Sequence, residues 1–348
     1  MRNLTLANLA LLALLNSSAL PAAQSSAVGL MYHHFGVEKY PSTNIRLEQF
    51  EQHLDYLADS DFKVLPLMTV LDALQTGETL PDKTVVITMD DAYDSIYSQA
   101  YPRLKKRGWP FTVFVSTDYI DKGFSNYMSW QQMREMQQHG ASFGNHSRSH
   151  DHLIRRLPGE TEAQWRRRVT DDIRSAQQRL DDELDAVIDV IAYPYGEYNL
   201  ALAQMVASLG MVGMGQHSGA MGVTSDFRFL PRFPMAEDFG DPDEFATKVS
   251  SLAMPLQQTP PVNPVTDAAR PTLTLSFERQ HAPLTQLSCF ASGQGRIEVK
   301  WVREYQAQIR ADKDLPAGRS RYNCTAPAGE SGRFYWFSQP WIRPGGTD

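Results

Sequence analysis

Two adjacent carboxylates, Asp90 and Asp91, follow a run of β-branched and apolar residues in the stretch VVITMDD. The run predicts a buried strand, so the pair stands at the carboxyl end of that strand. Active sites of barrel enzymes are assembled at this edge, and successive residues of a strand point to opposite sides. One carboxylate could therefore bind a ligand while the other stays free beside it. The pair could also be an acidic start to the next helix, where Asp is a favoured N-cap.

A histidine cluster, GNHSRSHDH, follows another short apolar run and contains His146, His150 and His152. His146 and His150 are four residues apart, so a helical turn or a tight loop would place both imidazoles on one side. Two histidines and one carboxylate are a recognised ligand set for a catalytic divalent metal. Together with the acidic pair at another strand end, the cluster predicts a metal site.

Three further segments place polar groups at expected strand ends. The stretch AYPYGEYN contains Pro194, Tyr195 and Gly196, which could also form a simple turn. His33 lies in MYHHF at the end of the first expected strand, and Arg232 lies between two prolines in LPRFPM. An arginine in such a place can orient a carboxylate through two parallel hydrogen bonds.

The elements that must position these residues alternate between strand-like and helix-like patterns from Val28 to about Leu256. Such alternation is typical of parallel strands joined by helical crossovers. The expected strands are residues 28–35, 62–67, 84–90, 111–117, 141–146, 187–196 and 211–215. The expected helices include residues 47–60, 95–107, 129–139, 160–183 and 200–208. The predicted fold class is α/β, a distorted (β/α)7-type barrel in residues 24–254, followed by a small all-β domain.

A proline-rich segment, residues 255–270, is predicted to be an extended linker. Residues 271–348 then show short alternating runs typical of a small β-sandwich-like domain. Cys289 and Cys324, the two cysteines of the chain, are predicted to form a disulfide there. Closing a loop of this length would stabilise the fold by about 3–4 kcal/mol. The domain also carries aromatic residues that could stack on sugar rings or pack in its core, namely Trp301, Tyr335, Trp336 and Trp341.

The N-terminal residues 1–23 have the order of a secretory signal peptide, with Arg2, an apolar stretch and small residues near Ala23. We therefore expect a periplasmic or secreted protein with no membrane span after cleavage. The net charge of −7 gives no reason to expect nucleic acid as a partner. The basic run at residues 166–168 is expected to be a solvated helix face.

From about Val28 to Leu256 the chain resembles the polysaccharide deacetylase family (NodB-homology, carbohydrate esterase 4-like). It is most similar to the exported branch that includes the poly-β-1,6-N-acetylglucosamine N-deacetylases of biofilm systems. The stretch TMDDAYDS is similar to the family's TFDDGY, HSRSH matches its H-S/T-x-x-H, and YPYGEYN is similar to its third motif. Met89 and Ala92 stand where the family has Phe and Gly. Alanine is tolerable there only if the backbone does not need a positive φ.

The resemblance implies that Asp91, His146 and His150 hold a divalent metal, which could be zinc, cobalt, nickel or iron. It implies that Asp90 is the general base and that the backbone N–H of Tyr195 stabilises the oxyanion. The general acid would be His33, which we favour, or His217.

The remaining site residues support these groups. Arg232 would hold Asp90 ionised and correctly aimed. Pro194, Tyr195, Gly196 and His217 would line the substrate site. The chain contains neither a G-x-S-x-G nor an HExxH motif, which leaves a serine nucleophile or a zincin-type site without support.

The activity implied is hydrolysis of the acetamide of N-acetylhexosamine units in a poly-N-acetylglucosamine-like polysaccharide, with release of acetate. A peptidoglycan, chitooligosaccharide or O-acetyl deacetylase is an alternative, because the chemistry is the same. A catalytically inactive glycan-binding protein is an alternative of another class. The C-terminal β-domain could contact a glycan or a protein.

Overall fold

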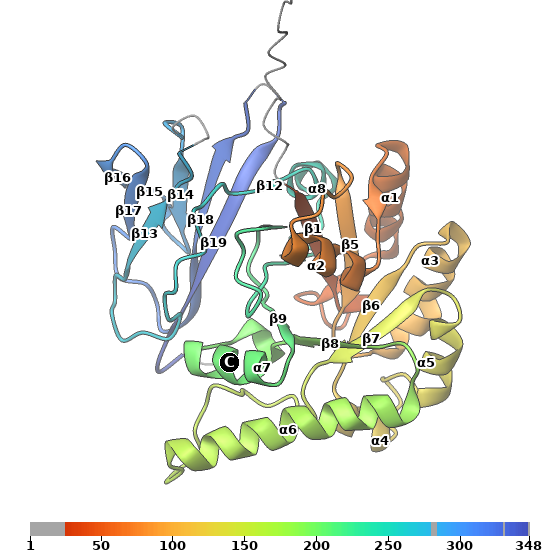
Figure 1. Ribbon diagram of the computed structural model, residues 1–348. Helices are drawn as coiled ribbons and strands as arrows, with labels where there is room; N and C mark the ends of the chain where they lie inside the picture. Colours follow the sequence, from red (N-terminus) through yellow and green to blue (C-terminus); the bar gives the residue numbers. More distant parts are fainter. Residues whose placement is uncertain (1–24, 280–283, 330, 347–348) are drawn as a thin grey trace, which may run out of the picture.

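The computed structural model describes residues 25–279, 284–329 and 331–346. The predicted signal peptide, residues 1–23, lies outside these ranges. The chain forms an α/β part, followed by a β-rich part made of two further sheets (Figure 1). In the part of the chain that the structure describes, no helix has the length and apolar character needed to cross a membrane.

The α/β part is built on a curled mixed sheet. Its parallel strands are β1 (Ser26–Tyr32), β5 (Thr84–Met89), β6 (Phe111–Val115), β7 (Ala141–Asn145), β8 (Val187–Ala192) and β9 (Val212–Met214). They follow the order β1-β5-β6-β7-β8-β9, and β10 (Ala220–Gly222) pairs antiparallel with β1. The predicted α/β fold with a distorted barrel is confirmed, as a half-barrel.

A short segment lies between the two ends of this sheet. Leu230 forms a bridge with Met214 of β9, and β11 (Phe233–Pro234) pairs in parallel with β1. This segment carries Arg232 between its two pairing points. The arginine is therefore held on the inner side of the curl, where the strand ends converge.

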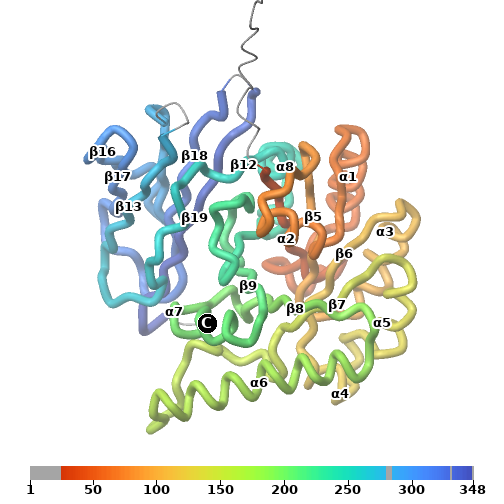
Figure 2. The backbone as a smooth tube through the Cα atoms, in the orientation of Figure 1, coloured from red at the N-terminus to blue at the C-terminus, as the bar shows by residue number. Residues whose placement is uncertain are grey.

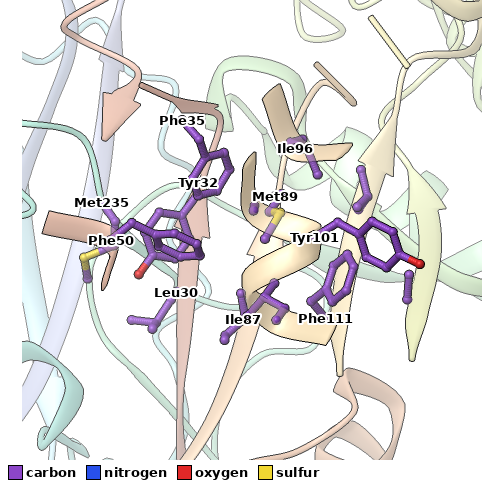
Figure 3. Packing of buried hydrophobic residues seen from close by; sticks show 14 of the residues in the cluster. Leu30, Tyr32, Phe35, Phe50, Ile87, Met89, Ile96, Tyr101, Phe111 and Met235 are labelled. Carbon is purple, nitrogen blue, oxygen red and sulfur yellow. The ribbon is translucent and has the colours of Figure 1, made fainter. Parts of the chain in front are cut away.

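The helices lie outside the sheet, and their apolar faces bury it. They are α1 (Leu47–Asp59), α2 (Leu67–Thr76), α3 (Tyr101–Arg107), α4 (Thr117–Asp121), α5 (Trp130–Gln137), α6 (Glu162–Glu183), α7 (Leu200–Ser208) and α8 (Pro242–Val249). Strands β5 and β6 are buried at every position, as expected for strands covered on both faces. Figure 3 shows part of this core, where Tyr32, Phe35 and Phe50 pack together beside Met235.

Several expected elements differ in extent from the observed ones, as two examples show. The strand predicted at residues 62–67 is reduced to β4 (Lys63–Val64), because α2 begins at Leu67. Leu67, Val70, Leu71 and Leu74 recur with helical spacing and are all buried. The helix predicted at residues 95–107 begins with a π-helical turn, Ile96–Ala100, before α3.

The β-rich part contains a three-stranded and a five-stranded sheet. The first has the order β13 (Thr272–Ser276), β17 (Gln306–Arg310), β16 (Val299–Arg303). The second has the order β12 (Leu252–Ala253), β19 (Phe334–Arg343), β18 (Gly318–Pro327), β14 (Ser288–Ala291), β15 (Gly295–Ile297). The predicted disulfide is confirmed, since Cys289 of β14 and Cys324 of β18 are paired directly across the ladder and bonded.

The four aromatic residues of this part that the sequence suggested for sugar stacking are packed against other side chains. Trp341 is buried in its core, where Trp301 and Tyr335 also pack. Trp336 points the other way and meets Phe233 of the barrel edge to face, with ring centroids 5.1 Å apart. An open stacking platform made of these four residues is therefore not present.

The two parts are joined by several contacts. Strand β12 pairs in parallel with β19, so the chain enters the second sheet directly after α8. Arg333 binds Asp82 at 2.6 Å and the carbonyl of Ser250 at 2.6 Å. In Figure 2 the segment that follows β9 runs between the barrel strands and β19. The predicted boundaries of the signal peptide, barrel, linker and β-domain stay predictions.

Candidate active site

The acidic pair stands directly after β5, where the backbone turns sharply. The N–H of Asp90 donates to the carbonyl of Tyr32 (2.9 Å), which continues the pairing of β5 with β1. Asp91 and Ala92 then have φ of 71° and 59°. This left-handed turn sends the two carboxylates in different directions. Ala92 thus occupies the conformation that favours glycine, at a cost of about 1–2 kcal/mol.

Asp90 is fully buried and bound by the equally buried Arg232. The two guanidinium nitrogens lie 2.7 and 2.9 Å from the two carboxylate oxygens. The guanidinium also donates to Thr88 Oγ1 (3.1 Å) and to the carbonyl of Gly215 (3.0 Å). Burial alone would raise the pKa of Asp90, but the charge of Arg232 lowers it below the usual value. Asp90 is therefore held ionised in a fixed orientation.

Asp91, His146 and His150 form one cluster, as the spacing of the histidines predicted. Asp91 Oδ1 lies 3.2 Å from His146 Nε2 and 3.1 Å from His150 Nε2. One ligand atom from each residue lies within 4.8 Å of the others. Burial opposes ionisation of Asp91, but both histidines hold its pKa well below the usual value.

The buried atoms of this cluster fit a cation. His146 Nδ1 lies 2.8 Å from the carbonyl of Ala192, which can only accept, so Nδ1 carries the proton of the neutral ring. Nε2 then carries a lone pair, and this atom is buried without a hydrogen-bond partner among the described residues. A lone pair aimed at a carboxylate is satisfied by a cation between them. The cluster is consistent with the divalent metal site that the residue types predicted.

The loop between the two histidines has the backbone that brings them together. Ser147 and His150 have φ of 62° and 56°. The Asn145 side chain accepts from the N–H of Ser147 (2.8 Å), and Ser147 Oγ accepts from the N–H of His150 (2.9 Å). These bonds fold the loop so that both imidazoles reach Asp91.

The two histidines considered as general acid occupy different surroundings. His33 Nε2 lies 4.0 Å from Asp90, at the wall of the cleft, and burial lowers the pKa of His33. Burial, together with the charges of Arg321 and Arg232, lowers the pKa of His217 to about 3. His217 is therefore neutral in the ordinary pH range.

The turn at Pro194–Gly196 lies beside Asp91, His146 and His150, which we call the metal-type cluster. Tyr195 has φ of 60°, and its ring stacks on His152 with centroids 3.8 Å apart. His152 is in turn paired with Glu197 at 2.7 Å, so the third histidine of the GNHSRSHDH stretch supports the turn and is not one of the metal-type cluster. Gly196 has φ of 68°, and a Cβ there would lie 2.5 Å from Gln216 Cβ, so the position requires glycine.

Several of the site residues line a cleft of about 750 Å³, to which both parts of the chain contribute. The barrel supplies His33, Asp91, His150, Tyr195 and His217, together with Tyr93, Tyr119 and Tyr127. The β-rich part supplies Ser292, Arg319 and Arg321. Sequence reasoning missed the tyrosines and the arginines. An arginine on a strand with alternating burial gives no local signal that it faces a site whose other residues lie more than 100 positions away in the sequence.

Comparisons with known proteins match the α/β part. A family model described as Polysaccharide deacetylase matches residues 77–214. YxkH of Bacillus subtilis (strain 168), whose name places it among the polysaccharide deacetylases, is 32% identical over 170 residues, which are 49% of this chain and 57% of that protein. The poly-beta-1,6-N-acetyl-D-glucosamine N-deacetylase of Staphylococcus aureus (strain MRSA252) is 25% identical over 213 residues, covering 60% of this chain and 73% of that one.

A solved structure agrees. The Streptococcus pyogenes deacetylase PplD in complex with acetate superposes with a TM-score of 0.58 and 27% identity, covering 65% of this chain and 99% of that one. The matched family range includes Asp90, Asp91, His146, His150 and Tyr195. It includes neither Arg232 nor the β-rich part.

Proposed function

Because the chain belongs to the polysaccharide deacetylase family, we propose that it removes acetyl groups from N-acetylhexosamine units of a polysaccharide by metal-dependent hydrolysis. The observation that carries the proposal is one cluster in one cleft, in which Asp91, His146 and His150 converge beside an Asp90 fixed by Arg232. The products are acetate and a free amine on the sugar.

Asp91, His146 and His150 would hold the metal, which could be zinc, cobalt, nickel or iron. When bound, such an ion polarises the acetamide carbonyl and lowers the pKa of a water molecule. The tautomer of His146, set by the Ala192 carbonyl, keeps Nε2 available for this role.

Asp90 is the general base in this proposal. Its carboxylate is ionised at neutral pH because Arg232 lowers its pKa, so it can accept a proton from the attacking water. Arg232 also prevents the carboxylate from turning away. The N–H of Tyr195, in a left-handed turn at the wall of the cleft, is assigned to the developing oxyanion.

His33 is the general acid that protonates the departing amine. It lies at the cleft wall and 4.0 Å from the carboxylate of Asp90, whose charge opposes the lowering of the His33 pKa by burial. His217 is a poorer donor of a proton because its pKa is lowered to about 3. It is assigned, with Pro194, Tyr195 and Gly196, to binding of the substrate.

The substrate proposed first is a poly-N-acetylglucosamine-like chain, because a similar protein from Staphylococcus aureus is named as a deacetylase of that polymer. Peptidoglycan, chitooligosaccharides and O-acetylated glycans are the alternatives, since the same groups would hydrolyse them. The proposal places the protein in the periplasm or outside the cell, in keeping with its disulfide.

The direct test incubates metal-loaded protein with β-1,6-linked and β-1,4-linked N-acetylglucosamine oligomers and with peptidoglycan. Released acetate and new amines are measured together. Equal amounts of both from one of these substrates would support the N-deacetylase. Acetate without amines, which can come only from O-acetyl esters of the peptidoglycan, would identify an O-deacetylase. Neither product from any of the substrates would contradict the proposal.

Variants separate metal binding from turnover. Asp91→Asn and His146→Ala are expected to lower bound metal at least tenfold and to abolish acetate release, because each removes a ligand. Asp90→Asn is expected to keep the metal and lower the rate at least a hundredfold, because general base catalysis contributes about 10²–10⁴-fold. His139→Ala and Asp72→Asn, both at exposed positions, are the matched controls. Full activity of Asp90→Asn would reject the assigned base.

One observation favours a second candidate function, a glycan-binding protein without turnover. Ala92 is forced into a left-handed conformation beside the carboxylates, where the related motif has glycine. Metal analysis of the purified protein discriminates the two functions. A cluster that stays empty after reconstitution with zinc, cobalt or nickel would favour the binding protein, whereas one ion per chain favours the enzyme.

A further inference from the structure

We propose that the wall of the cleft formed by the β-rich part is a binding subsite for an acidic group, a carboxylate or a phosphate ester, carried by the polysaccharide. Arg321 and Arg319 are the residues that bind it. This inference rests on the proposed deacetylase function. Among the substrates named above it favours acetylated amino-sugar chains that also carry acidic groups, such as peptidoglycan, over a neutral poly-N-acetylglucosamine chain.

The strand geometry directs both arginines to the cleft. Residues of β18 alternate between the two faces of the sheet, so Arg319 and Arg321 share one face while Tyr322 and Cys324 are buried on the other. Both arginines are among the residues that line the cleft. Arg319 donates to the carbonyl of Tyr195 at 2.9 Å, which holds this face of the strand against the turn at Pro194–Gly196.

Arg321 lacks an acceptor in its own chain. It is half-buried, and its guanidinium forms no hydrogen bond or ion pair with the residues that the structure describes. Burial lowers the pKa of Arg321, which reflects the loss of water around it. Its backbone is fixed by Ser292, whose Oγ accepts from the N–H of Arg321 at 3.0 Å. A guanidinium that is partly desolvated and unpaired, on a backbone that is fixed, is satisfied by a bidentate anion.

The charges around the cleft favour an anion at this wall. Among its described lining residues, Asp91 is the sole carboxylate, and it faces His146 and His150. The cleft wall formed by the β-rich part therefore keeps an excess of positive charge, although the whole chain carries −7. A neutral sugar offers hydroxyl and amide groups to an arginine, whereas a carboxylate or phosphate matches both its charge and its geometry.

The test measures binding by calorimetry with metal-free protein, so that no turnover consumes the ligand and the result does not depend on deacetylase activity. The probes are neutral N-acetylglucosamine oligomers, hyaluronan fragments of equal length, which carry carboxylates, and phosphorylated N-acetylglucosamine oligomers. At least one acidic probe is expected to bind about tenfold more tightly than the neutral one. The acidic probe that binds more tightly identifies the group.

Charge-removing variants assign the preference to this wall. Arg321→Gln is expected to weaken binding of the preferred acidic probe about tenfold and to change binding of the neutral oligomer less than twofold. Arg319→Gln is expected to act in the same direction. Arg303→Gln removes the same charge from an exposed position on the other sheet and should leave both affinities unchanged. Equal affinity for all three probes, or a preference that survives in Arg321→Gln, would overturn the proposal.

Discussion

At the scale of single residues, Ala92 has a left-handed backbone conformation that its side chain disfavours. It is fully buried beside the acidic pair and has φ of 59°. An L-residue in this conformation is strained by about 1–2 kcal/mol, whereas glycine is not. The strain is maintained because β5 and the hydrogen bond from the N–H of Met128 to the Ala92 carbonyl (2.9 Å) fix the turn.

Ala92→Gly is therefore expected to raise the free energy of unfolding by up to about 1 kcal/mol, since relief of strain exceeds the added flexibility of the unfolded chain. Ala203→Gly is the control, because Ala203 is equally buried but lies within helix α7. That change should destabilise by about 1 kcal/mol. Denaturant titration of both variants measures the difference. Equal destabilisation by the two substitutions would show that Ala92 is not strained.

The residue types of the site and the pairing of Arg232 with Asp90 could be predicted from the sequence and its family resemblance, but the contact of Arg319 with the Tyr195 turn could not. Asp90, Asp91, His146 and His150 follow apolar runs at strand ends, so period and position were sufficient to group them. The bond from Arg232 to Asp90 spans 142 residues, and the bond from Arg319 to Tyr195 spans 124. Such pairs depend on how the sheet curls, and no local pattern contains that information.

At the scale of elements, the strongest periodic segments were predicted well. Helix α7 has the expected bounds, and α6 begins two residues later than expected because Thr161 caps it. Short pieces were not predicted, among them β10, β11 and β12. Each is two or three residues long, and each is defined by pairing with a distant strand rather than by its own pattern. Element length therefore limited what the sequence could show.

The disulfide is an element-scale constraint, because it joins two adjacent strands, β14 and β18, of the sheet that forms the cleft wall. Its loop spans 35 residues, and opening it should lower the free energy of unfolding by about 3–4 kcal/mol. The double substitution Cys289→Ala, Cys324→Ala is expected to show this loss in thermal and denaturant unfolding. A reducing agent should lower the stability of the wild type but leave that of the double variant unchanged. Equal stability of oxidised and reduced wild type would contradict the prediction.

At the scale of the whole molecule, the catalytic cleft depends on both parts of the chain. The barrel supplies the metal-type cluster and the acidic pair, while the β-rich part supplies the opposite wall and the contact to the Tyr195 turn. Trp336 packs on Phe233, and β12 pairs with β19. We therefore expect the two parts to unfold in a coupled manner. The stability of either part then reports on the whole cleft.

This coupling makes the whole molecule sensitive to acid. Burial lowers the pKa of His34 and of His53 to about 4, and that of His217 to about 3. In the unfolded chain each of these histidines would titrate near 6.5. Between these values the unfolded state binds more protons, so the free energy of unfolding falls as the pH decreases from about 6.5 towards 4.

His53 is the clearest case, because it lies away from the metal-type cluster. It stacks on Phe245 with ring centroids 3.9 Å apart, and its two nitrogens are bonded to Tyr32 (3.0 Å) and to the carbonyl of Gly240 (2.9 Å). Since the carbonyl can only accept, Nε2 carries the proton and Nδ1 accepts from the tyrosine hydroxyl. Protonation of Nδ1 would break that arrangement. We expect His53 alone to remove roughly 1–2 kcal/mol of stability between pH 7.5 and pH 5.

Denaturant unfolding of the wild type and His53→Gln at the two pH values measures this contribution. Glutamine can keep one donor and one acceptor but does not titrate, so the variant is expected to lose less stability on acidification even if it is less stable at pH 7.5. His139→Gln, at an exposed position, should retain the full pH dependence of the wild type. Wild type and His53→Gln with identical losses between pH 7.5 and pH 5 would show that His53 does not link folding to protonation.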